Sequence, residues 1–160
     1  MKICVIGTGT MAKGIVKAFA AKMPVVMKSR TQASLDKAMA SISKGYAKLV
    51  EKGKMTQEAV DALLANITTT TDYATFADAD LVIEAAVEDM QLKKDVFMEL
   101  DKICKPETIF ATNSSSLSIT EIAACTSRPT QFIGCHFFNP ADRMASIASW
   151  AILPFSTSLL

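Results

Sequence analysis

The sequence predicts an α/β fold of the Rossmann type, a doubly wound, mostly parallel sheet with helices on both faces. Three observations predict it. Short apolar runs typical of buried strands alternate with amphipathic helical patterns along the chain. A glycine-rich turn follows the first of these runs. Polar residues come directly after most of the strands, at the edge where such sheets bind ligands.

The bulk composition bounds the class of protein. The chain has 160 residues, half of them apolar, and a net charge of +1. This length suits one domain with its own core. The sequence has no basic run, so we expect no nucleic-acid partner. It also lacks a secretory signal and any apolar run of roughly 18 residues, so we expect a cytoplasmic protein without a membrane partner.

The residues that most often bind metals are sparse. The four cysteines, Cys4, Cys104, Cys125 and Cys135, form no CxxC motif, and we expect them to be reduced structural thiols. His136 is the only histidine, which excludes a multi-histidine metal site. We therefore expect no metal.

The chain opens with a strand, a turn and a helix. Residues 3–6 are apolar and β-branched, and a helical apolar pattern follows the turn. Gly7 permits the tight turn, Gly9 lets the backbone approach a pyrophosphate, and Ala12 allows close packing of helix on strand. Glycines also serve tight turns without any ligand, but this context favours nucleotide binding. The residues assigned to the cofactor here are Gly7, Gly9, Thr10 and Met11.

The end of the second strand, residues 24–27, selects between two cofactors. An acid about 20 residues past the glycines would bind the ribose hydroxyls of NAD. This chain instead has Lys28, Ser29, Arg30 and Thr31. These side chains suit a 2′-phosphate, because a guanidinium offers donors in a fixed fork. The alternative is that the charges are solvated loop residues. We favour NADP(H) as the cofactor, with NAD(H) as the second choice.

Two helices are expected next. The first covers residues 32–53 and ends near Gly53, and the second covers about 57–64 after a Thr56 N-cap. Ser41 and Lys48 are seven residues apart, so they share one face of the first helix. Lysines on such a face usually confer only solubility, but they could also bind an anionic ligand.

The rest of the chain keeps the alternation. We expect strands at 67–71, 81–83, 108–112 and 132–135, a helix that runs through residues 92–100 and ends before Pro106, and a short helix at 118–124. The polar residues at the strand ends then converge on one edge of the sheet: Gly7, Gly9, Ser29, Arg30, Glu88, Asn113 to Ser116, and His136.

His136 is a candidate base. A lone histidine is often structural, but this one closes a strand beside a serine-rich loop. Oxidation of an alcohol needs a base for the hydroxyl proton, and imidazole titrates in the right range. A serine hydroxyl could orient the substrate oxygen. Asn139 could hold the nicotinamide amide or the loop.

Four segments together resemble one enzyme family. They read GTGTMAKGI, LVIEAAVEDMQLKKDVF, CKPETIFATNSSSLSIT and GCHFFNP. They are similar to the 3-hydroxyacyl-CoA dehydrogenases, in particular the bacterial 3-hydroxybutyryl-CoA dehydrogenases, over about residues 1–140. The resemblance implies a reversible reaction between acetoacetyl-CoA and 3-hydroxybutyryl-CoA, with hydride carried by a nicotinamide cofactor.

The resemblance also implies roles for individual residues. His136 would be the general acid/base, and Ser115 would bind the substrate oxygen. The segment at Ser29 is similar to that of the NADP-preferring members. The remaining assignments are Glu88, Lys93 and Asn139 around the nicotinamide, Asn113 at the cofactor, and Ser41 and Lys48 with coenzyme A.

The chain departs from the family after residue 140. Ala148 stands where the family has a glutamate that pairs with the catalytic histidine. The family's helical second domain, which closes the cleft and forms the homo-oligomer, is absent from this sequence. We expect residues 1–140 to be the cofactor domain and 141–160 a divergent apolar tail. The tail could cover exposed surface or associate with another copy, but we favour a truncated or frame-shifted sequence. The alternative to an impaired enzyme is therefore a non-catalytic dinucleotide-binding fragment.

Overall fold

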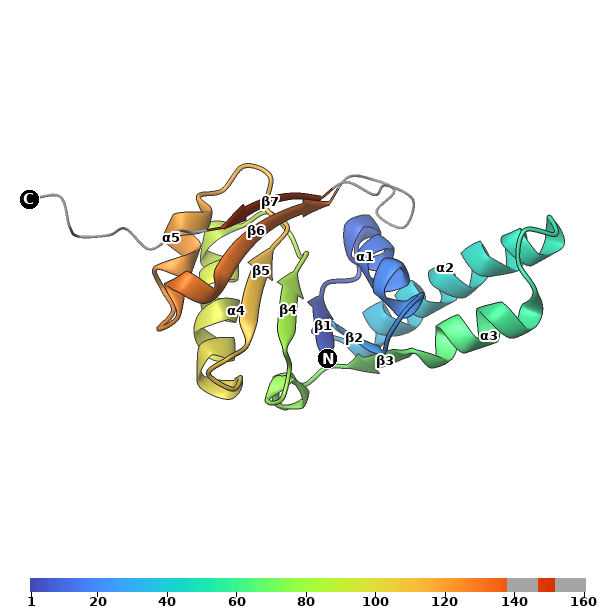
Figure 1. Cartoon of the computed structure of the whole chain (residues 1–160), viewed down its shortest axis with the longest axis horizontal. Helices are drawn as coiled ribbons and strands as arrows, with labels where there is room; N and C mark the ends of the chain where they lie inside the picture. Colours follow the sequence, from blue (N-terminus) through green and yellow to red (C-terminus); the bar gives the residue numbers. More distant parts are fainter. Residues whose placement is uncertain (138–146, 152–160) are drawn as a thin grey trace, which may run out of the picture.

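A computed structural model of the chain describes residues 1–137 and 147–151, and its strands form one sheet (Figure 1). The strand order is β3-β2-β1-β4-β5-β6-β7. β1 to β6 are parallel, and β7 pairs with β6 antiparallel. The strands are β1 (Ile3–Ile6), β2 (Val25–Lys28), β3 (Ile67–Thr70), β4 (Leu81–Glu84), β5 (Ile109–Thr112), β6 (Phe132–Phe137) and β7 (Ile147–Ala151). The predicted Rossmann-type sheet is confirmed.

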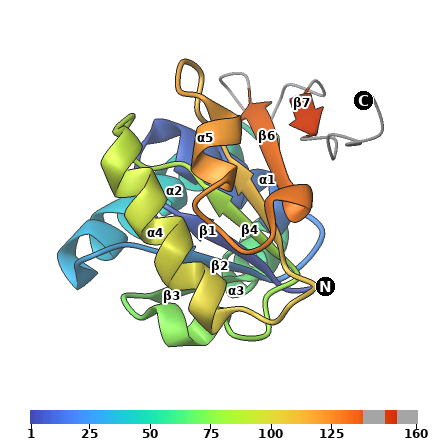
Figure 2. The same ribbon diagram turned by 90° about the vertical axis from the view of Figure 1, so that its left-hand side faces the viewer.

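Helices cover both faces of this sheet, as expected. In Figure 2, α4 and α5 lie in front of the sheet and α1 to α3 behind it. The helices are α1 (Thr10–Ala20), α2 (Gln32–Glu51), α3 (Gln57–Ala65), α4 (Met90–Ile103) and α5 (Ile119–Ala123), with 3-10 turns η1 (Tyr73–Phe76) and η2 (Pro129–Gln131). A strand alternates its side chains between faces, so β1 contributes to two cores.

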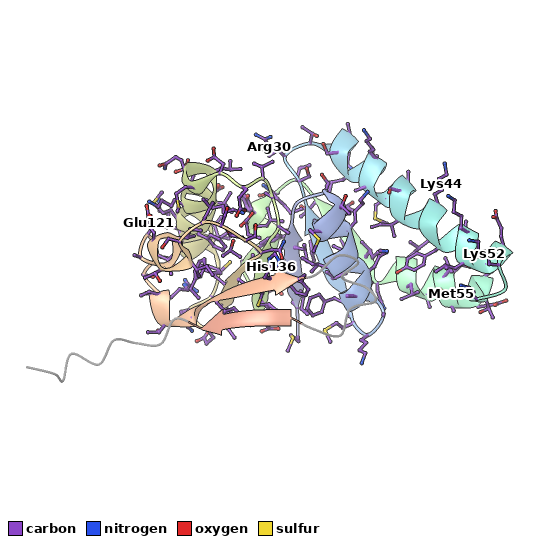
Figure 3. All side chains as sticks on the ribbon, turned by 90° about the horizontal axis from the view of Figure 1, so that it is seen from above. Arg30, Lys44, Lys52, Met55, Glu121 and His136 are labelled. Atoms are coloured by element: carbon purple, nitrogen blue, oxygen red, sulfur yellow. The ribbon has the colours of Figure 1, made fainter. Side chains whose placement is uncertain are left out.

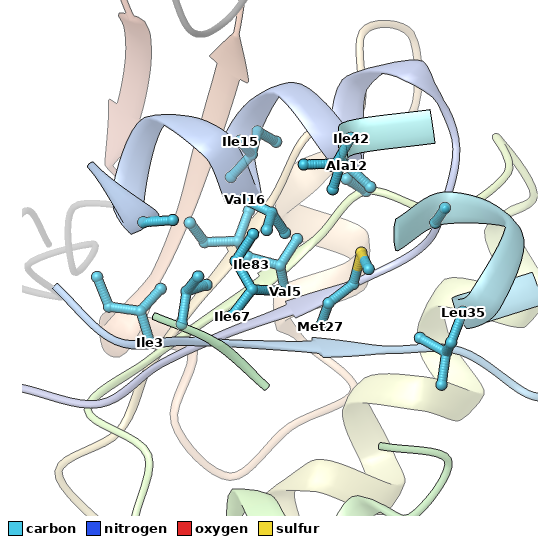
Figure 4. Packing of buried hydrophobic residues seen from close by; sticks show 14 of the residues in the cluster. Ile3, Val5, Ala12, Ile15, Val16, Met27, Leu35, Ile42, Ile67 and Ile83 are labelled. Atoms are coloured by element: carbon cyan, nitrogen blue, oxygen red, sulfur yellow. The ribbon is translucent and has the colours of Figure 1, made fainter. Parts of the chain in front are cut away.

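The two cores follow that alternation. Ile3 and Val5 of β1 pack under α1 to α3 with Ile15 and Leu35 (Figure 4). The other face of β1 packs under η1, α4 and α5. There the rings of Phe97, Phe110 and Phe132 meet, with centroids 4.6 to 6.3 Å apart. Both faces of the sheet are therefore covered by packed side chains, and a ligand can bind only at the edges of the sheet.

The helix boundaries confirm several sequence signals. Thr56 caps α3 by accepting from the Ala59 amide at 3.2 Å. Gly53, just after α2, has φ +64, the left-handed conformation that favours glycine.

The four cysteines are free thiols, and burial raises the pKa of Cys4 to about 12. Such a thiol carries little thiolate and is chemically inert.

The last two strands differ from expectation. β6 continues to Phe137, so His136 lies inside the strand instead of following it. β7 was not predicted, because its apolar segment shows no period of its own. It is an edge strand, and its backbone pairing with β6 makes this segment a strand although its own sequence pattern does not predict one. The division of the chain at residue 140 stays a prediction, and Asn139 lies outside the described residues.

Among the described residues, none of the helices combines the length and the apolar character needed to cross a lipid bilayer.

Candidate functional site

The candidate site lies along the carboxyl ends of the parallel strands. Because β1 pairs with β2 and β4, and β4 with β5 in continuous register, the residues that follow these strands share one edge. The turn after β1, the start of α2, the Glu88 loop, the serine loop after β5 and His136 all lie there. The predicted convergence of strand ends is therefore present in the structure.

Gly7 and Gly9 have different reasons to be glycine. Gly7 has φ +124, and a Cβ placed on it would lie 2.6 Å from the Ala85 carbonyl oxygen. The fold itself therefore requires glycine at this position. Gly9 has φ −69, and a Cβ there would meet nothing within 4 Å. This open space fits a ligand whose phosphates approach the backbone closely.

The start of α1 faces the same space. Its N-cap, Gly9, supplies no side chain, and its first turn has no acid. The other α-helices that the structure describes begin with a side-chain cap, from Thr31, Thr56, Asp89 and Ser118. The amides at the start of α1 are thus suited to bind an anion. Thr10 and Met11, which the sequence assigns to a cofactor, are the first two residues of this helix.

The segment after β2 divides into residues that face the edge and one that does not. Arg30 is exposed beside the start of α2 (Figure 3), and Ser29 is half-buried. Thr31 accepts from the Ser34 amide at 3.3 Å as the N-cap of α2. Lys28 is only 4% exposed, and its Nζ lies 3.2 Å from the centre of the Tyr73 ring. Burial lowers the pKa of Lys28.

Lys28 is therefore neither the phosphate donor that its place in the sequence suggests nor a solvated loop charge. It is the last residue of β2, and strand alternation directs its side chain to the η1 and α4 face. The cationic candidate for a 2′-phosphate in this segment is Arg30.

A buried ion pair lies beneath the site. The Glu84 and Lys93 side chains are each 1% exposed, and Lys93 Nζ donates to both carboxylate oxygens at 2.8 and 2.7 Å. Thr112 Oγ1 and the Ala86 amide also donate to Glu84, both at 2.7 Å. The structure thus places Lys93, a predicted cofactor residue, in the core beneath the edge.

Sequence reasoning did not assign Glu84 to the site. The signal was an acid at the end of a strand that is otherwise apolar, together with a lysine on the following helix. A charged group at a buried strand end needs a partner. The sequence did not say which lysine on α4 would supply it.

Glu88 joins this pair to the serine loop. Its Oε2 lies 3.6 Å from Lys93 Nζ. Its Oε1 accepts from the Ser115 and Ser116 amides at 3.0 and 3.1 Å and from the Ser114 hydroxyl. Burial acts to raise the pKa of Glu88, but these hydrogen bonds and the Lys93 charge lower it to about 2.

The low pKa predicts a dependence of stability on pH. The charged form of Glu88 favours the folded state, so its contribution is present above the ordinary pKa of 4.5 and is lost as the pH falls towards 2. Because the side chain is 35% exposed, solvent screening reduces the effect to about 1 kcal/mol. The difference in the free energy of unfolding between the parent and Glu88→Gln, measured by urea unfolding, should shrink by that amount from pH 5 to pH 2.5. Parallel curves would contradict the assignment.

His136 is held near the serine loop by Asn113. The Phe137 amide donates to Asn113 Oδ1 at 2.9 Å, and the Asn113 amide donates to the Glu84 carbonyl at 2.8 Å. His136 is half-buried, and Ser115 is exposed. In the antiparallel pair, Ala148 lies directly opposite His136.

The predicted coenzyme A residues lie on α2. Ser41 and Lys48 line a shallow hollow together with Ala40, Lys44 and Gly45. The Ser41 hydroxyl accepts from Lys13 Nζ of α1 at 2.9 Å, which brings another cation to this face. Figure 3 shows Lys44 on the same helix, which starts beside Arg30. The face is cationic and adjoins the start of α1, where Lys13 lies.

No group of three or more His, Cys, Asp or Glu side chains gathers to hold a metal ion in the part of the chain that the structure describes.

Comparison with known proteins identifies the family. Residues 2–147 match the model of the 3-hydroxyacyl-CoA dehydrogenase NAD binding domain. A 3-hydroxybutyryl-CoA dehydrogenase of Clostridioides difficile is 53% identical over 145 residues, and a probable one of Deinococcus radiodurans is 47% identical. Each alignment covers 90% of this chain and 52% of the relative, so the chain spans about half the length of the curated relatives it matches.

A solved structure shares the fold. The crystal structure of 3-hydroxybutyryl-CoA dehydrogenase from Escherichia coli aligns with a TM-score of 0.89 at 38% identity, over 93% of this chain and 32% of that one. The sequence match and the shared fold extend over nearly all of the described residues. The chain therefore belongs to the 3-hydroxyacyl-CoA dehydrogenase family, of which it carries the NAD-binding domain.

Proposed function

We propose that this chain is the cofactor-binding part of an NADP-preferring 3-hydroxybutyryl-CoA dehydrogenase, which reversibly reduces acetoacetyl-CoA to 3-hydroxybutyryl-CoA. The observation that carries the proposal is the convergence of the glycine turn, the Glu88 loop, the serine loop and His136 on one sheet edge. Relatives named 3-hydroxybutyryl-CoA dehydrogenase support the substrate class. The nicotinamide dinucleotide supplies or accepts the hydride.

The residues of this chain would share the remaining work. The amides at Gly9 and the start of α1 would hold the pyrophosphate, and Arg30 with Ser29 a 2′-phosphate. Glu88 and Asn139 would hold the nicotinamide end, with Lys93 and Asn113 positioning the site from behind. The other roles are Ser115 on the substrate oxygen, Ser41 and Lys48 on coenzyme A, and His136 moving the hydroxyl proton.

A second candidate function is dinucleotide binding without turnover. The register that places Ala148 opposite His136 favours it. A carboxylate beside a catalytic imidazole orients the ring and stabilises its protonated form. An alanine at this register position supplies neither effect.

One experiment tests both functions. The purified 160-residue chain is titrated with NADPH and NADH by fluorescence, and acetoacetyl-CoA is then added. Binding followed by substrate-dependent oxidation that His136→Ala abolishes supports the enzyme. Binding without oxidation supports the second function. Absence of binding to a folded chain contradicts both.

A further inference from the structure

We propose that Glu84 is a positioning residue of the dinucleotide site: through Lys93 it fixes Glu88 and, with it, the loop Ser114–Ser116. The inference rests on the proposed function for its ligand but on the contacts of the buried ion pair for its geometry. Glu84 itself has no surface at the site, because its side chain is 1% exposed. It acts only through its neighbours.

The Glu84 carboxylate is held by three elements at once. It belongs to β4, it accepts from Thr112 of β5, and it is ion-paired with Lys93 of α4. The Ala86 amide, in the turn after β4, is a further donor. With donors on both oxygens, this carboxylate cannot rotate without breaking several hydrogen bonds. It is a fixed anchor for the Lys93 ammonium.

The Lys93 ammonium, held by Glu84, in turn fixes the position of the Glu88 carboxylate. Its ammonium is bound on one side by Glu84 and lies 3.6 Å from Glu88 on the other. The second oxygen of Glu88 accepts from the amides of Ser115 and Ser116. A continuous series of polar contacts therefore joins the interior of the sheet to the loop that carries the proposed substrate serine.

Stability alone does not explain this arrangement. Replacing a whole buried ion pair with uncharged residues of similar shape is often neutral or stabilising, whereas removing one partner is strongly destabilising. The three groups also carry a net charge of −1, so Glu88 competes with Glu84 for a single cation. The balance of the two contacts sets where Glu88 lies.

The test is the double variant Glu84→Gln with Lys93→Met, which removes both buried charges. It should melt close to the parent, because neither member of the buried ion pair is left alone and the carbonyl oxygen of the introduced glutamine can still accept from the Thr112 hydroxyl. Its Kd for NADPH and for NADH should rise about tenfold, as expected when a charged hydrogen-bond partner is lost. By NMR, the Ser115 and Ser116 amides should exchange about tenfold faster than in the parent.

A matched control lies at the other end of α4. Arg128 Nε donates to Asp101 at 2.6 Å, and both side chains are largely buried. Asp101→Asn should lower the melting temperature and leave dinucleotide affinity and the serine amides unchanged. This control separates loss of a buried ion pair from loss of position at the site.

Two outcomes overturn the proposal. One is a double variant with parental serine amide exchange. The other is a double variant whose dinucleotide Kd equals that of the parent, provided that the parent binds a dinucleotide. If the parent itself binds neither dinucleotide, the proposed function fails, and amide exchange still decides whether Glu84 positions the serine loop.

Discussion

Gly7→Ala should destabilise the chain by about 2–6 kcal/mol. The positive φ of +124 costs a residue with a side chain on the order of 1–3 kcal/mol. The added Cβ would also lie 2.6 Å from the Ala85 carbonyl oxygen and 3.2 Å from the Ala12 Cβ. Ala85 lies at the sheet edge and Ala12 lies in α1. Relieving the steric overlap therefore requires moving the helix away from the sheet, which costs about 1–3 kcal/mol more. Urea unfolding followed by circular dichroism measures the loss.

Gly9→Ala is the matched control, because it adds the same methyl group two residues away. Nothing lies within 4 Å of that position, and φ is −69, so we expect a loss of less than about 1 kcal/mol, as for an alanine at an N-cap. The NADPH Kd should instead rise about tenfold or more, since the methyl group would occupy space that the pyrophosphate needs. Equal destabilisation by the two variants would contradict this division of roles, as would unchanged NADPH affinity in Gly9→Ala.

The elements that local patterns specify were predictable from the sequence. The strand, turn and helix around Gly7 each have a signal within a few residues, and so do the Thr56 cap and the Gly53 stop. Parallel pairing then follows, because helices between successive strands require crossover connections. β7 lacked such a signal, since an edge strand is selected by its partner and not by a pattern of its own.

The site was predictable as a place but not as a network. Polar residues after strands predicted the edge, because a parallel sheet gathers its carboxyl ends. How deeply each of these side chains is buried was not predictable. Lys28 and Lys93 look like solvated lysines in the sequence, yet one packs on Tyr73 and the other pairs with Glu84. Their burial depends on residues well separated from them in the sequence, which no local pattern encodes.

The double variant Ser29→Asp with Arg30→Ile should reverse the cofactor preference. Arg30 is exposed at the start of α2, where a guanidinium can bind a 2′-phosphate with two parallel hydrogen bonds. Removing it and adding a carboxylate should raise the NADPH Kd by about a hundredfold, from lost charged hydrogen bonds and new repulsion. The same carboxylate can accept from the ribose hydroxyls of NADH, whose Kd should fall. Fluorescence titration of both dinucleotides measures the ratio.

Lys28→Met supplies the control that separates phosphate binding from net charge. It removes one positive charge from the end of β2, half of the charge change of the double variant, and it does so on the opposite face, where Lys28 packs on Tyr73. If Arg30 binds the phosphate directly, Lys28→Met should leave the ratio of the NADPH and NADH constants within about twofold of the parent, since a general field is weak and screened at physiological salt. A logarithmic shift in Lys28→Met about half as large as that in the double variant, in proportion to the change in charge, would mean that diffuse charge sets the preference. An unchanged ratio in the double variant would mean that this segment does not contact the 2′ position, and the preference for NADP would lose its support.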